Sequence, residues 1–66
     1  MSAYNIEIGT RVKWNDVAIA EFQGKERELQ EQRVYKVVDI INDDMVLIAD
    51  EYSEVEVFIS ELEVVQ

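Results

Sequence analysis

The second half of the chain alternates between apolar runs and short polar breaks. Three runs rich in Val, Ile and aromatic residues span residues 34–41, 45–49 and 54–59, and the polar stretches 42–44 and 50–53 separate them. Short runs of this kind, bounded by Asn, Asp and Ser, are typical of β-strands joined by tight turns. The pattern predicts a β-meander, and the first half of the chain must supply what this sheet packs against.

The three predicted strands differ in the faces they bury. The strand at 34–41 alternates imperfectly, which a bulge or twist near Val38 would explain. The strand at 45–49 is apolar throughout, which indicates burial on both faces or one face lying beneath a loop. In the strand at 54–59, the odd-numbered residues from Val55 to Ile59 are predicted to point inward, and Glu54, Glu56 and Phe58 outward.

The first residues also alternate, on both sides of a glycine. Ile6 and Ile8 precede Gly9, and Val12 and Trp14 follow it. This spacing predicts one strand that is bent or bulged at Gly9, where glycine permits a turn with positive φ.

Residues 15–33 break the alternation. Asn15 and Asp16 form a turn or helix N-cap pair, and residues 25–33 are mostly strong helix formers. The segment is predicted to be a long loop with helical character, held to the sheet by three apolar side chains, Ile19, Phe22 and Leu29. Long loops in small domains often carry function.

The end of the chain completes the predicted sheet. Ser60 is predicted to cap a single helical turn, and Val64 and Val65 to form a last short strand. The motifs IGTRVKW, YKVVDI, MVLIADEYSEVEVF and SELEVV, spread from residue 8 to residue 65, resemble those of small SH3-like barrels and most of all Tudor-type domains. The resemblance implies a mainly β fold for one domain, residues 1–66. The expected architecture is a small five-stranded SH3-like (Tudor-like) barrel with a long, partly helical loop between strands 1 and 2.

Tudor-type domains hold methylated Lys or Arg in an aromatic cage, where a cation lies over ring faces. By position, the resemblance implies a cage of Trp14, Tyr35 and Tyr52 with Glu54 as a polar wall. Two departures weigh against it: the loop after the first strand is longer than in such domains, and Asp50 stands where another aromatic is often found. The rings therefore also fit a purely structural role in core and rim.

Charge is distributed unevenly. Residues 34–66 carry nine acidic residues and one Lys, a net charge of −8, whereas residues 1–33 carry six acidic and five basic residues, a net charge of −1. Such a surface repels nucleic acid, whose binding depends on neutralising phosphates. No apolar run approaches the roughly 20 residues of a membrane span. The opening nine residues lack the pattern of a signal peptide, which favours the cytosol.

The residue types argue against catalysis and metal binding. The chain has no His and no Cys, so the usual general base near neutral pH and the usual zinc ligands are missing. Loop carboxylates such as Asp43 and Asp44 lack the ordered spacing of a calcium loop. We therefore expect no enzyme activity, no cofactor and no metal site.

The favoured hypothesis is a non-catalytic interaction module that binds a basic protein or peptide. Its contact residues are predicted to be Trp14, Phe22, Tyr35 and Tyr52 as apolar contacts, with Asp50, Glu51 and Glu54 for electrostatic steering. Two alternatives stay open. One is an acidic nucleic-acid mimic that inhibits a DNA- or RNA-binding enzyme, and the other is a structural accessory domain without a discrete ligand site.

Overall fold

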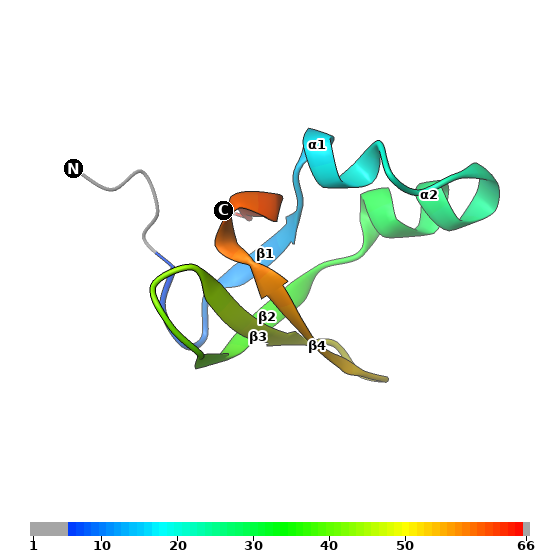
Figure 1. Ribbon diagram of the computed structural model, residues 1–66. Coiled ribbons are helices and arrows are strands. Elements are labelled where there is room, and N and C mark those ends of the chain that lie inside the picture. The colour runs from blue at the N-terminus through cyan, green and yellow to red at the C-terminus, as the bar shows by residue number, and fades with distance from the viewer. Residues whose placement is uncertain (1–5, 66) are drawn as a thin grey trace.

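The meander forms the centre of an antiparallel sheet. The computed structural model describes residues 6–65 of the 66-residue chain, and its five strands lie in the order β4-β3-β2-β1-β5 (Figure 1). The elements are β1 Arg11–Trp14, α1 Asp16–Ile19, α2 Gly24–Gln32, β2 Tyr35–Ile40, β3 Met45–Ala49, β4 Glu54–Phe58, the 3-10 helix η1 Ile59–Glu61 and β5 Leu62–Val64. The predicted mainly β fold with five strands is confirmed.

The predicted meander is present, with β3 paired antiparallel to both β2 and β4. All five residues of β3 pair with β4, from Met45 opposite Phe58 to Ala49 opposite Glu54. The register of the β2–β3 pair shifts after Val37 and before Asp39, so the bulge predicted near Val38 is confirmed. The turn between β2 and β3 is held by Asn42, whose Oδ1 accepts hydrogen bonds from the backbone N–H groups of Asp44 and Met45 at 2.8 and 3.0 Å.

The strand predicted to bend at Gly9 begins only after it. Residues 6–10 form a turn and no strand, and Gly9 has φ of 96°, as its predicted turn requires. The Gly9 N–H donates to the carbonyl of Val37, and the Val37 N–H donates to the carbonyl of Thr10, at 2.8 and 2.9 Å. These bonds fix the turn against β2, and the chain then enters β1 at Arg11.

The sheet does not close into a barrel, so that part of the prediction is wrong. Strands β4 and β5 are the two edges of the sheet, and β5 pairs with β1 alone within the described residues. Among the described residues β4 and β5 do not pair with each other, because η1 carries the chain away from the end of β4. Helix η1 turns directly off the end of β4, and its carbonyls at Ser60 and Glu61 accept hydrogen bonds from the side chain and backbone of Asn15. This anchor directs the short strand β5 to β1.

Helix η1 also begins one residue earlier than predicted. It spans Ile59–Glu61, and its N-cap is Phe58, which makes no side-chain hydrogen bond. The predicted capping role of Ser60 is therefore wrong.

The core lies on one face of the curved sheet. It consists of Val12, Tyr35, Val37, Val46, Ile48, Val57 and Leu62, with Ile6, Trp14 and Ile59 packed against it. In β3, Val46 and Ile48 are fully buried whereas Met45, Leu47 and Ala49 are half-buried, so the prediction of burial on both faces does not hold. Val55 points to the core side but stays 40% exposed, because it lies on the edge strand.

The segment between β1 and β2 folds into two helices that lie against β1 (Figure 1). Asn15 is the N-cap of α1, and its Oδ1 accepts a hydrogen bond from the Ala18 N–H at 3.0 Å, as predicted. Leu29, expected to anchor the second helix, is 58% exposed, and that prediction is wrong. Gln30 is the buried residue of α2 instead.

Candidate functional site

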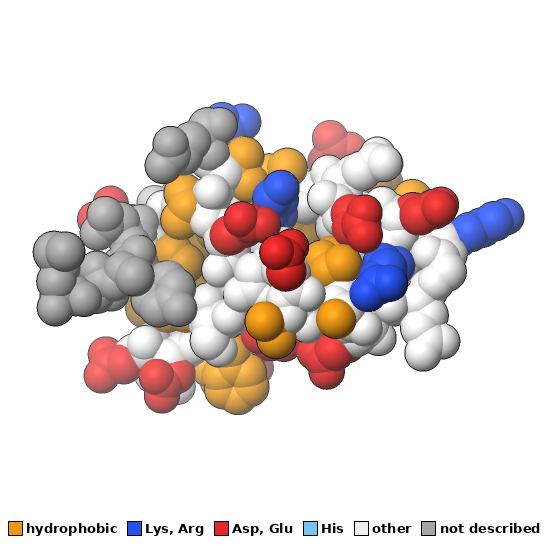
Figure 2. All heavy atoms as spheres, turned by 90° about the horizontal axis from the view of Figure 1, so that it is seen from above, with side chains coloured by type: hydrophobic (Ala, Val, Ile, Leu, Met, Phe, Trp, Pro, Cys, Tyr) orange, Lys and Arg blue, Asp and Glu red, His pale blue; other side chains and the backbone are white. Residues whose placement is uncertain are grey.

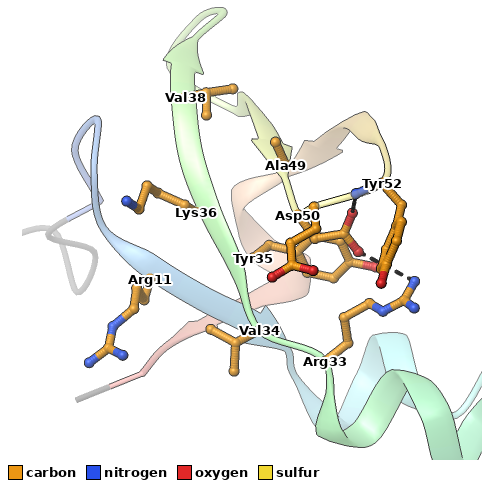
Figure 3. A pocket seen from close by; sticks show the side chains of 10 residues that line it. Arg11, Arg33, Val34, Tyr35, Lys36, Val38, Ala49, Asp50 and Tyr52 are labelled. Carbon is orange, nitrogen blue, oxygen red and sulfur yellow. Dashed lines mark hydrogen bonds and ion pairs between the residues drawn. The ribbon is translucent and has the colours of Figure 1, made fainter.

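The candidate site is a cavity of about 570 Å³ between the start of β2, the end of β3 and the loop that follows β3 (Figure 3). Its lining combines apolar, acidic and basic side chains: Arg11, Arg33, Val34, Tyr35, Lys36, Val38, Ala49, Asp50, Glu51 and Tyr52. Arg11 and Lys36 lie on the β1 side of β2, and Arg33, Asp50 and Tyr52 lie on the other side. The cavity therefore has chemically different ends.

Asp50 builds the loop at one end. Its Oδ1 accepts hydrogen bonds from the backbone N–H groups of Tyr52 and Ser53 at 2.8 and 2.9 Å, and its own N–H donates to the carbonyl of Ser53 at 3.0 Å. Its Oδ2 has no hydrogen bond but lies 3.4 Å from Nη1 of Arg33. An Asp that bonds the backbone two residues ahead stabilises a tight turn. Asp50 is thus occupied by its own loop and by Arg33.

These interactions shift the ionisation of both partners. The Tyr52 N–H, the Ser53 N–H and the Arg33 charge together hold the pKa of Asp50 below its ordinary value of 3.8, although partial burial opposes them. The Tyr35 hydroxyl, more than the Asp50 carboxylate, raises the pKa of Arg33. Both side chains therefore stay charged at neutral pH.

This geometry predicts an acid-sensitive loop. Because the Asp50 pKa is lower in the folded state than in the unfolded chain, its charge stabilises the fold above about pH 4, and that contribution is lost as the pH falls through the lowered value. Asp50→Asn is therefore expected to be less stable than wild type at pH 7, with a gap that narrows toward pH 3. Urea unfolding of both proteins across this range measures the gap, and a gap that stays constant with pH would refute the role of the charge.

The outer face of the sheet forms the floor of the cavity. Arg11 pairs with Lys36, Lys36 with Ala49, and Ala49 with Glu54, so the four residues form one row across four strands. Directly paired residues on antiparallel strands project to the same face. The row therefore runs from two cations, across a small alanine, to a carboxylate.

Tyr52 stands at the mouth of the cavity. Its side chain is 82% exposed, although its backbone is fixed by Asp50. Glu51 precedes it in the loop, and Glu54 begins β4 just after the loop. Both glutamates are exposed, and neither forms an ion pair within residues 6–65. The side chains of Tyr52 and Glu51 thus share one end of the cavity, and Glu54 begins the strand beside it.

The structure brings together only part of the predicted contact set. Tyr35, Asp50, Glu51 and Tyr52 line the cavity, and Glu54 is in the strand beside it. Trp14 and Phe22 do not line it; their ring centroids lie 5.9 Å apart, next to the helices.

Trp14 and Tyr35 are fixed to each other and to α2. Their ring centroids lie 6.0 Å apart in an edge-to-face arrangement. Gln30 Oε1 accepts hydrogen bonds from Trp14 Nε1 at 2.8 Å and from the Tyr35 hydroxyl at 3.1 Å, and Gln30 Nε2 donates to Glu26 at 2.9 Å. These contacts give both rings a structural role, while the ring of Tyr52 stays exposed.

The sequence interpretation missed the three basic residues of the cavity, Arg11, Arg33 and Lys36. Arg11 and Lys36 alternate with core residues in their strands, so each could be assigned to the outer face. Only the pairing register places them opposite each other. The net negative charge of the second half of the chain gave no indication that basic side chains lie together at this cavity.

A second hollow of about 420 Å³ lies at the turn between β2 and β3. It is lined by Ile6, Ile40, Asn42, Asp43, Asp44, Phe58, Ile59 and Ser60. Asn42 is occupied in its own turn, and the hollow contains no basic side chain. None of the predicted contact residues lines it, so a substitution in this hollow is a suitable control for the binding experiments.

Two further features bear on the chemistry. Within residues 6–65 no three carboxylates gather in a group that could hold a metal ion. No helix in the same range has the length and apolar character needed to cross a membrane.

No protein-family model, no curated protein and no solved structure matches this chain. The site is therefore interpreted from its own geometry.

Proposed function

We propose that this protein is a non-catalytic interaction module that binds a basic protein or peptide at the mouth of the cavity. The observation that supports it is the exposed side chain of Tyr52 at the mouth of the cavity, on a loop that Asp50 fixes in place and that also carries Glu51. A Lys or Arg side chain over an aromatic ring gains a cation–π interaction, and adjacent carboxylates add charge attraction.

The overall charge of the chain favours the same class of partner. Acidic, basic and hydrophobic side chains lie interspersed on the face shown in Figure 2. The net charge of the chain is −9, which attracts cationic partners and accelerates their association at low salt. Partner binding is therefore expected to weaken as salt rises.

We also propose that the fold is related to the SH3-like topology. The strand order and the 3-10 helix before the last strand are consistent with an SH3-like topology. A Tudor-type cage of three rings is less consistent, because Trp14 and Tyr35 both bond Gln30. The proposal therefore assigns cation contact to Tyr52 and not to a complete cage. The cytosolic location also stays a prediction from the sequence.

The nucleic-acid mimic is less well supported than the interaction module. A mimic needs a continuous anionic surface, whereas Glu54 shares its cross-strand row with Lys36 and Arg11. The accessory-domain alternative predicts that no peptide binds the cavity at all, and the following experiment tests it.

The test is selection of random nine-residue peptides displayed on phage against the wild-type protein at low salt. Selected peptides are expected to be enriched in Lys and Arg. Tyr52→Ala is expected to weaken binding of a selected synthetic peptide about 5- to 30-fold, since a desolvated cation–π contact contributes roughly 1 to 2 kcal/mol. Calorimetry or fluorescence anisotropy measures the change.

Phe58→Ala provides the matched control. Phe58 is an exposed aromatic residue that lines the second hollow, so its removal is expected to leave peptide binding unchanged. Absence of Lys and Arg enrichment would overturn the proposed function. An equal loss of binding in Tyr52→Ala and Phe58→Ala would overturn the assignment of the site.

A further inference from the structure

We infer that Arg11 and Lys36 form a second subsite, which binds a carboxylate on the same peptide segment whose Lys or Arg contacts Tyr52. This inference rests on the proposed function and specifies the partner further. The ligand becomes an extended segment of mixed charge, with a basic residue for one end of the cavity and an acidic residue for the other.

Two positive charges, those of Arg11 and Lys36, are paired across neighbouring strands. Arg11 and Lys36 are directly opposite each other in the β1–β2 ladder, and both line the cavity. Like charges in this position destabilise a sheet. An anion bound between them would relieve the repulsion and gain charge-assisted hydrogen bonds from both side chains.

Neither Arg11 nor Lys36 has a carboxylate ion-pair partner among residues 6–65. Among the ion pairs formed by the described residues, Lys13 contacts Glu63 at 3.9 Å and Arg33 contacts Asp50 at 3.4 Å, and neither Arg11 nor Lys36 takes part. The nearest carboxylate along the row is Glu54, which is separated from Lys36 by the width of β3. On the same face, Asp39 lies in the row next to Lys36 and Glu63 lies diagonally from Arg11, yet neither carboxylate forms an ion pair with these two cations.

The distance between the two cations and Glu54 along the row suits an extended peptide. Neighbouring strands lie roughly 4.8 Å apart, so Lys36 and Glu54 are about 10 Å apart along the row, and Arg11 and Glu54 about 14 Å. An extended peptide advances roughly 3.3 Å per residue. A segment crossing the sheet would thus place its acidic residue three or four positions from its basic residue. Ala49, between the two ends, leaves room for the peptide backbone.

The peptide selection described above tests this inference through a second property of the same peptides. Wild-type protein is expected to select peptides that carry Asp or Glu three or four positions from Lys or Arg. The double variant Arg11→Gln/Lys36→Gln is expected to lose the preference for Asp and Glu but to keep the preference for Lys and Arg.

The affinities of the wild type and of the double variant are measured for one selected peptide and for its Asp→Asn or Glu→Gln counterpart. These four affinities form a double-mutant cycle. The double variant is expected to bind the acidic peptide about three- to tenfold more weakly than wild type does, as two exposed charge pairs would give. It should bind the neutralised peptide as well as wild type does. Lys13→Gln, which removes a cation that is paired with Glu63 outside the cavity, is the control for net charge.

The outcomes separate the two proposals. Peptides without Lys and Arg enrichment would refute the proposed function itself. Lys and Arg enrichment without an accompanying carboxylate would leave that function standing and refute the second subsite. A loss of binding free energy in Lys13→Gln that is about half the loss in Arg11→Gln/Lys36→Gln, which removes two charges where Lys13→Gln removes one, would show that general charge, and not this pair, attracts the acidic residue.

Discussion

Replacing Ile48 with alanine is expected to lower the free energy of unfolding by about 2 to 5 kcal/mol, the range typical of large-to-small changes in a core. Ile48 is fully buried and is the largest such side chain among residues 6–65. It lies in the central part of the meander, paired with Val37 on one side and Val55 on the other. Its truncation would leave a cavity in the cluster of side chains that joins the strands of the curved sheet.

The consequence is severe because the domain is small. Natural domains have roughly 0.05 to 0.15 kcal/mol of stability per residue, which gives about 3 to 10 kcal/mol for a chain of this length. Ile48→Ala therefore removes a large fraction of the total. Urea unfolding followed by the fluorescence of Trp14, the single tryptophan, measures the loss.

Two controls calibrate this prediction. Ile48→Val is expected to cost about 0.5 to 1.5 kcal/mol, since it removes one methylene group. Leu47→Ala, on the half-buried face of the same strand, is expected to cost less than Ile48→Ala. A loss below about 1 kcal/mol for Ile48→Ala would contradict the assignment of this face as the core.

The meander could be predicted from the sequence because its information is local. The strand at Met45–Ala49 has the bounds that its apolar run predicted, and the imperfect alternation of β2 identified the bulge near Val38. Both signals come from the two-residue period of side chains along a strand. The position of Asn15 as a helix cap is equally local, since its side chain bonds an N–H three residues ahead.

Features that depend on contacts between distant segments could not be predicted in this way. Closure of the sheet depends on whether the edge strands β4 and β5 meet, and the segment between them is held by bonds from the distant Asn15 to Ser60 and Glu61. The cationic end of the cavity likewise depends on the register that places Arg11 opposite Lys36. Tyr35, Asp50, Glu51 and Tyr52 of the predicted contact set line the cavity, whereas the indole of Trp14, which was predicted to contact the partner, bonds the second helix.

The second helix gives the clearest case of a misleading pattern. Leu29 is the only large apolar residue between Lys25 and Arg33, so hydrophobicity alone selects it as the anchor. The structure exposes Leu29 and buries the neighbouring Gln30. A buried polar group is tolerated when its hydrogen bonds are made, and Gln30 makes three. Polar groups on β1 and β2, and not apolar contact by Leu29, thus hold this helix to the sheet.

Gln30→Ala is accordingly expected to lower the free energy of unfolding by about 2 to 4 kcal/mol. The substitution removes the acceptor of the buried Tyr35 hydroxyl, and a buried donor left without a partner costs roughly 1 to 3 kcal/mol. It also removes the bond of the part-buried Trp14 Nε1, which contributes about 0.5 to 1.5 kcal/mol where water can take over. The emission of Trp14 is expected to shift to longer wavelength in the folded variant, because water would replace the amide of Gln30 around the indole.

Leu29→Ala is the matched control, since it shortens the adjacent side chain of the same helix. Because Leu29 is exposed, its loss is expected to change stability by less than about 0.5 kcal/mol and to leave the emission of Trp14 unaltered. A larger loss for Leu29→Ala than for Gln30→Ala would show that apolar contact anchors the helix after all. The opposite order, with a spectral shift only in Gln30→Ala, is expected if one amide oxygen joins the helix to both strands.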